Sequence, residues 1–187
     1  MGNIGLGLLF LVTLPLLFSL FFATQTGGMI EIDEAIEAPY LERVQSDTML
    51  VYFGYVGCAK VCTPILGTLS ELNQKLDRSP ATQGVKIVFV NLRPEVQPEQ
   101  AAAFAKGFDP DFEGIYLTQS QLMRLDRELG VFFSAALEDK TEINHSDHLY
   151  LIRREGGKLI LKTIYPTHPI DQDRIRGDLE YQEKNKR

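Results

Sequence analysis

Apolar runs of two different periods alternate along this chain, and this alternation constrains the fold more than any other feature. Residues 49–55 and 85–90 form continuous runs rich in β-branched and aromatic side chains, which is typical of strands buried on both faces. Between these runs the apolar residues follow a helical spacing, at Ile65, Leu66, Leu69, Leu72 and Leu76. A strand, a helix and a second strand in succession predict an α/β protein.

The remaining elements extend this order without repeats. They are a helix near 98–108, a strand at 115–117, a helix at 118–129, a hairpin at 149–152 and 159–164, and a last helix around 175–179. Thr118 and Gln121 form a capping-box pattern for the third helix, and Gly130 ends it. The order β-α-β-α-β-α-β-β-α predicts a mixed sheet flanked by helices on both faces. This is the thioredoxin-like order with one extra helix and strand after the second strand.

The first 28 residues carry no charged side chain. Residues 4–23 are apolar enough and long enough to cross a bilayer as one helix, and the segment after them is a poor cleavage site for a signal peptide. An uncleaved anchor is therefore the expectation, and a cleaved signal peptide is the alternative. The first basic residue is Arg43, so no positive charge holds the following domain on the cytoplasmic side. We therefore expect a single-pass protein of the bacterial inner membrane whose domain faces the periplasm.

Composition sets the domain layout and excludes several functions. We expect a transmembrane anchor at 1–28, a linker and domain entry at 29–48, and a thioredoxin-like domain at 49–187. The net charge of −6 and the lack of a basic block argue against a nucleic-acid partner. Two cysteines are too few for a disulfide scaffold or a four-thiolate metal site.

The two cysteines, Cys58 and Cys62, lie four residues apart where the first strand gives way to the first helix. A helix N-terminus and the intervening Lys60 both favour thiolates. Two chemistries remain open for such a pair. One is disulfide exchange with a partner. The other is copper binding, either of Cu(I) or, with a nitrogen ligand added, of Cu(II).

His145 favours the metal site, because it precedes the strand at 149–152 and this loop abuts the cysteine turn in the thioredoxin order. Thioredoxins present a proline there, whereas this chain has none between Pro110 and Pro166. We therefore expect Cys58, Cys62 and His145 to bind copper. We interpret His148 as a neighbouring residue in the strand and His168 as a loop residue.

Three segments resemble the Sco/SenC family of copper chaperones and identify the chain as a divergent member. Residues 50–62, Leu-Val-Tyr-Phe-Gly-Tyr-Val-Gly-Cys-Ala-Lys-Val-Cys, are similar to that family's strand and Cys-x-x-x-Cys signature. Asn144-His145-Ser146, followed by residues 149–151, resembles its Asp-His-Ser segment before a strand, and 108–112 matches another habitual stretch. The family's acidic segment after the second strand reads here Leu92-Arg-Pro-Glu-Val-Gln-Pro98, without its aspartates.

The resemblance implies a thioredoxin-like fold, a copper site formed by Cys58, Cys62 and His145, and a role in maturing the copper centre of cytochrome c oxidase. The implied partner is a copper-site apoprotein such as cytochrome c oxidase subunit II. We expect a metallochaperone rather than an enzyme. The alternatives are a thiol:disulfide oxidoreductase with Cys58 and Cys62 as the redox-active pair, or a redox or copper sensor that acts on a membrane partner's cysteines.

Overall fold

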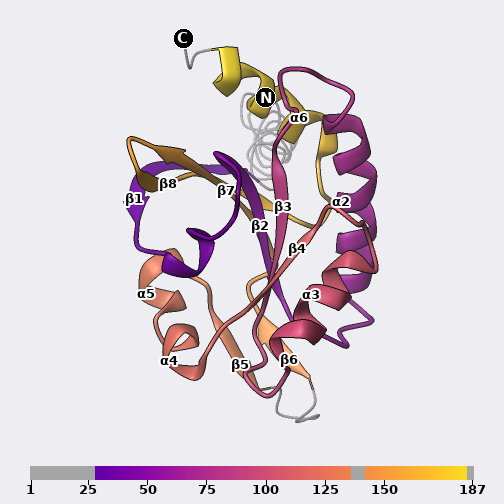
Figure 1. Ribbon diagram of the computed structural model, residues 1–187, viewed down its shortest axis with the longest axis vertical. Helices are drawn as coiled ribbons and strands as arrows, with labels where there is room; N and C mark the ends of the chain where they lie inside the picture. The colour runs from indigo at the N-terminus through magenta and orange to yellow at the C-terminus, as the bar shows by residue number, and fades with distance from the viewer. Residues whose placement is uncertain (1–27, 136–141, 185–187) are drawn as a thin grey trace, which may run out of the picture.

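The computed structural model describes residues 28–135 and 142–184. Its main sheet has six strands in the order β1-β8-β7-β2-β3-β4, and β5 and β6 form a separate two-stranded sheet (Figure 1). The strands are β1 (Ile30–Ile36), β2 (Thr48–Gly54), β3 (Lys86–Asn91), β4 (Glu113–Tyr116), β5 (Phe133–Ala135), β6 (Ile143–His145), β7 (His148–Glu155) and β8 (Lys158–Pro166). The helices are η1 (Pro39–Leu41), α2 (Cys62–Leu76), α3 (Pro98–Lys106), α4 (Gln119–Leu122), α5 (Leu125–Leu129) and α6 (Gln172–Lys184).

Strand β2 lies at the centre of the main sheet. It pairs in parallel with β3 and antiparallel with β7, and all seven of its residues are buried. Its side chains alternate between two apolar cores: Met49, Val51 and Phe53 enter one, and Leu50 and Tyr52 enter the other. Burial on both faces explains why the strand reads as a continuous apolar run in the sequence.

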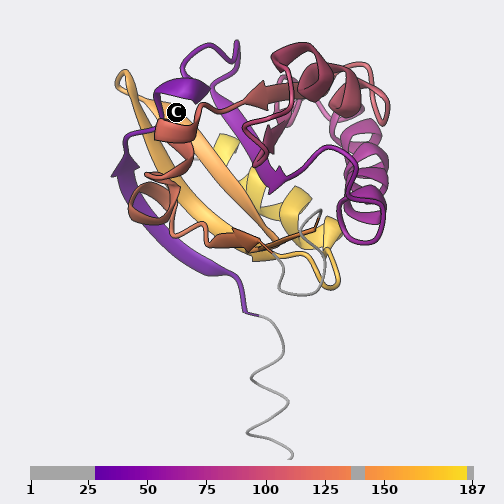
Figure 2. The same ribbon diagram turned by 90° about the horizontal axis from the view of Figure 1, so that it is seen from below.

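Helices cover both faces of this sheet. The apolar sides of α2, α3 and α6 form one core, and η1, α4 and α5 close the other. Both ribbon views place α2 and α3 on one side of the sheet and α4 and α5 on the opposite side (Figures 1 and 2). The predicted mixed sheet with helices on both faces is therefore confirmed.

Several local predictions are also confirmed. Thr118 and Gln121 form the capping box at the start of α4, and Gly130 adopts a left-handed conformation, with φ of 63°, after α5. The β7–β8 hairpin turns at Gly156 and Gly157, which both have positive φ.

The structure also contains elements that the predicted order lacks. Strand β1 lies within the segment 29–48 and pairs with β8. The short β5–β6 pair precedes β7 in the chain. The single helix predicted at 118–129 is divided into α4 and α5. Within the residues described, no helix is long and apolar enough to cross a membrane. The predicted span at 4–23 lies outside these residues.

Candidate metal site

The cysteine turn connects the end of β2 to the start of α2. The Cys58 amide donates to the Tyr55 carbonyl oxygen over 3.2 Å, and Gly57 between them has a φ of 93°, which favours glycine. Helix α2 begins at Cys62, whose amide donates to the Cys58 sulfur over 3.3 Å. The Thr63 hydroxyl donates to the Cys58 carbonyl oxygen over 3.0 Å. Backbone and side-chain bonds thus hold both thiols on one side of the turn.

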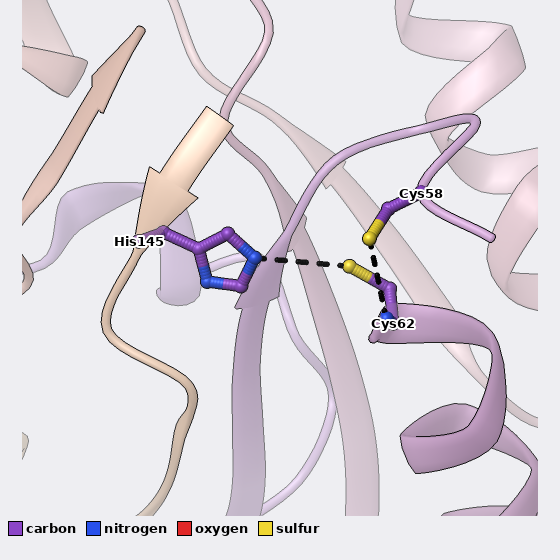
Figure 3. A group of neighbouring side chains, drawn as sticks. All are labelled: Cys58, Cys62 and His145. Carbon is purple, nitrogen blue, oxygen red and sulfur yellow. Dashed lines mark hydrogen bonds between the residues drawn. The ribbon is translucent and has the colours of Figure 1, made fainter. Parts of the chain in front are cut away.

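His145 reaches the thiols from the other side of the site. It ends β6, and its Nε2 atom lies 3.8 Å from the Cys62 sulfur (Figure 3). The possible ligand atoms of Cys58, Cys62 and His145 all lie within 4.8 Å of one another. The structure therefore brings together the three residues that the sequence singles out.

The backbone selects the tautomer of His145. Its Nδ1 atom lies 3.1 Å from the carbonyl oxygen of Ser146. Because a carbonyl oxygen only accepts hydrogen bonds, Nδ1 carries the proton in this contact. The lone pair of a neutral ring is then on Nε2, the nitrogen that faces Cys62, which is the arrangement a metal ligand requires.

The two thiols differ in acidity. Burial raises the pKa of the Cys58 thiol, but hydrogen bonds from the Cys62 side chain and from the amides of Cys62 and Val61 outweigh it, so this pKa lies below its usual value. Burial and the neighbouring Cys58 raise the pKa of the Cys62 thiol to about 12. Cys58 is thus the first to ionise, and an incoming metal ion must displace the proton of Cys62.

Aromatic and charged side chains surround this group. The rings of Tyr52 and Tyr55 meet the His145 ring edge to face, with centroids 6.4 Å and 6.0 Å away. The Tyr55 hydroxyl donates to a carboxylate oxygen of Glu142, and the Arg93 guanidinium lies 4.7 Å from the Tyr55 ring centroid. Sequence reasoning did not find Tyr55 and Glu142, which are 87 residues apart.

The other two histidines lie outside this group. His148 begins β7 and is half-buried. His168 is largely exposed, and its Nε2 atom lies 2.6 Å from a carboxylate oxygen of Asp147. Neither residue belongs to the Cys58–Cys62–His145 cluster.

The donor set is suited to copper. Two thiolates and one imidazole combine soft and borderline ligands, which favours Cu(I) and accommodates Cu(II). A structural zinc site usually has four protein ligands. Among the described residues, the cluster around the cysteines offers three possible protein ligands.

Comparison with known proteins gives a consistent result. The sequence profile of the SCO1/SenC family matches residues 32–180. The mitochondrial SCO2 homolog of Bos taurus is 27% identical over 112 residues, which are 58% of this chain and 42% of the relative. The SCO2-like protein RP587 of Rickettsia prowazekii (strain Madrid E) is 25% identical over 136 residues, which are 70% of this chain and 65% of the relative. The match thus spans less than half of the bovine protein.

Solved Sco structures have the same fold. Apo Sco1 of Thermus thermophilus has a TM-score of 0.62 and 27% identity, and the alignment covers 84% of this chain and 95% of that one. ScoI of Arabidopsis thaliana, described with copper bound, has a TM-score of 0.66 at 19% identity, with 78% and 89% covered. The second similarity concerns the fold alone. Because the family profile matches most of the chain, this protein belongs to the SCO1/SenC family.

Proposed function

We propose that this protein is a copper metallochaperone that binds one copper ion through Cys58, Cys62 and His145. The observation that carries the proposal is the convergence of two sulfurs and one nitrogen within 4.8 Å in a member of the SCO1/SenC family. Copper is cargo here, so its release matters as much as its binding. A half-buried imidazole beside two buried thiols provides a site that a partner can approach from the His145 side.

The copper assignment is supported by relatives of the same fold. ScoI of Arabidopsis thaliana, ScoI of Bradyrhizobium japonicum and yeast Sco1 are all described with copper bound. BsSco is described as a member of a family of cytochrome c oxidase assembly proteins. By extension, the client proposed for this protein is a copper-site apoprotein such as cytochrome c oxidase subunit II.

The proposed setting is the bacterial inner membrane, with residues 4–23 as a single transmembrane anchor and the domain in the periplasm. The uncharged sequence of this segment and the absence of nearby Lys and Arg residues support that orientation. A cysteine-labelling experiment with a membrane-impermeant maleimide on intact cells would test it. Labelling of a cysteine introduced at exposed Lys158 is expected without permeabilisation, and labelling only after permeabilisation would contradict it.

Copper titration of the full chain in detergent tests the site itself. We expect one copper ion per chain, with a sulfur-to-copper charge-transfer band in the Cu(II) form. Cys58→Ser, Cys62→Ser and His145→Ala should each change that band. Each should also lower copper affinity by more than the roughly 10–100-fold that loss of an outer-shell partner costs.

His168→Ala is the matched control, because His168 is exposed and pairs with Asp147 outside the cluster. It should bind copper like the wild type. An unchanged affinity and spectrum in His145→Ala would exclude the three-ligand site.

A second function, thiol:disulfide exchange, is favoured by the unequal acidity of the two cysteines. The Cys58 thiolate would attack a partner's disulfide to form a mixed disulfide. The Cys62 sulfur would then displace the partner's thiolate, so that the partner is reduced and Cys58–Cys62 is oxidised. Exchange with an oxidised client peptide by metal-free His145→Ala would support this function, whereas no exchange by the metal-free wild type would exclude it.

A further inference from the structure

The hairpin that carries His145 is not part of the main sheet. Strand β6 pairs with β5, whereas both cysteines follow β2 of the six-stranded sheet. Two hydrogen bonds join the residues that flank the hairpin. The Ser146 amide donates to the Phe132 carbonyl oxygen over 2.8 Å, and the Phe132 amide donates to the Ser146 hydroxyl over 3.0 Å. These bonds shape the hairpin but do not fix its distance from the thiols.

A side-chain hydrogen bond joins the two parts. The Tyr55 hydroxyl donates to Glu142, which immediately precedes β6 and lies three residues before His145. Tyr55 belongs to the cysteine turn, because its carbonyl oxygen accepts from the Cys58 amide. The same ring meets His145 edge to face, with an interplanar angle of 87°. Tyr55 therefore contacts the segments that carry all three proposed ligands.

Arg93 fixes the Tyr55 ring from another direction. Its guanidinium carbon lies 4.7 Å from the ring centroid, and its Nη1 atom donates to the Val56 carbonyl oxygen over 3.4 Å. The side chain of Tyr55 is 2% exposed, so water offers its hydroxyl little alternative to Glu142. A buried phenol that donates to a carboxylate forms a hydrogen bond that is costly to break.

We propose that Tyr55 and Glu142 are a positioning pair, whose hydrogen bond holds the β5–β6 hairpin so that His145 Nε2 faces the two thiols. The inference rests on the proposed copper site and extends it to residues that are not ligands. The Tyr55–Glu142 bond acts through His145, so loss of the Glu142 acceptor lowers copper affinity only when that imidazole is present. This requirement separates positioning from a general effect on folding. Tyr55 also interacts with the side chain of Cys58, so its own loss has a second effect.

The test is a double-mutant cycle on the full chain in detergent. Tyr55→Phe keeps the ring and removes the hydroxyl, and Glu142→Ala removes the acceptor. Each should lower Cu(I) affinity about tenfold, as measured by competition with a chromogenic chelator, and should weaken the nitrogen coupling of His145 in the Cu(II) EPR spectrum. Glu142→Gln should retain most of the affinity, because an amide oxygen also accepts from a tyrosine hydroxyl.

In the His145→Ala background Glu142→Ala should have no further effect, whereas Tyr55→Phe should keep only the part of its loss that comes from its interaction with Cys58. Tyr165→Phe is the matched control, since this buried tyrosine also donates to a carboxylate, Asp178, over 3.2 Å, and it should bind copper like the wild type. Equal losses for Glu142→Ala with and without His145, or wild-type affinity in both Tyr55→Phe and Glu142→Ala, would overturn the proposal. Wild-type affinity in His145→Ala itself would instead overturn the proposed three-ligand site.

Discussion

Gly54, the last residue of β2, leaves the space that the Cys62 thiol occupies. A Cβ atom at this position would lie 2.8 Å from the Cys62 sulfur and 3.1 Å from the Phe89 ring. Real Cβ atoms essentially never approach another heavy atom within 3.0 Å, so one of these groups would have to move. The end of the strand therefore helps to set the position of a proposed ligand.

We expect Gly54→Ala to displace the Cys62 thiol and to lower copper affinity measurably. Overpacking should also reduce the free energy of unfolding by about 1–3 kcal/mol, as measured by urea denaturation of the metal-free protein. Gly67→Ala in α2 is the control, because a Cβ there meets nothing within 4 Å. It should stabilise the helix by up to about 1 kcal/mol. Wild-type copper binding by Gly54→Ala would show that the thiol does not need this space.

At the residue scale, the sequence predicted which side chains meet but not what holds them. Cys58 and Cys62 are close in the chain, and the thioredoxin order brought His145 to them. Tyr55 and Glu142 carry no local pattern, because their contact depends on how the β5–β6 hairpin lies against the cysteine turn. A hydrogen bond of this kind follows from three-dimensional geometry rather than from periodicity.

At the scale of elements, α3 packs closely against β4. A Cβ atom on Gly114 would lie 2.1 Å from the Ala101 carbonyl oxygen and 2.6 Å from the Ala102 Cα atom. Backbone of α3 thus packs directly against β4, and small residues on both elements make this possible. The apolar face predicted for the helix, which includes Ala101 and Ala105, is buried.

Gly114→Ala should therefore force α3 away from the sheet. We expect a loss of several kcal/mol in the free energy of unfolding, at the upper end of what overpacking costs, because backbone atoms cannot rotate aside. Thermal unfolding of the metal-free protein measures it. Gly177→Ala in α6 provides the comparison, since nothing lies within 4 Å of its added Cβ, and it should be neutral or stabilising. Equal stability of the two variants would contradict this view of the α3–β4 contact.

The elements that the sequence did not predict lie at the edges of the fold. Strand β1 is an edge strand in which five of the seven residues are exposed, and an irregularity in its register between Glu31 and Glu34 interrupts its alternation. Strands β5 and β6 contain three residues each, too few for a period to be recognised. The central strands were predictable because burial on both faces leaves a continuous apolar run.

At the scale of the whole molecule, the two cores on either side of the sheet bury several tyrosines. Burial is the main cause that raises the pKa of Tyr150 to about 12, and it raises the pKa values of Tyr40, Tyr52 and Tyr165 further. The folded protein thus keeps these phenols neutral at a pH where the unfolded chain ionises them. Their contribution to stability is fully present below pH 10, the ordinary pKa of tyrosine, and is lost as pH rises through the folded values.

We therefore expect the metal-free protein to unfold cooperatively in alkali. Above about pH 10, each such tyrosine should subtract roughly 1.4 kcal/mol per pH unit from the free energy of unfolding. Four of them would exhaust the ~5–15 kcal/mol of a typical domain within a few pH units. Urea denaturation at a series of pH values, followed by far-UV circular dichroism, measures this slope.

Tyr40→Phe makes the prediction specific. The buried Tyr40 hydroxyl has no hydrogen-bond partner among the residues that the structure describes. Removing this hydroxyl should therefore change the free energy of unfolding little at neutral pH. Removing one titrating group should make the alkaline slope shallower by about 1.4 kcal/mol per pH unit. Tyr181→Phe should leave the slope unchanged, because Tyr181 is 69% exposed. If Tyr40→Phe retained the full slope, the burial of neutral tyrosines would not be the cause of alkaline unfolding.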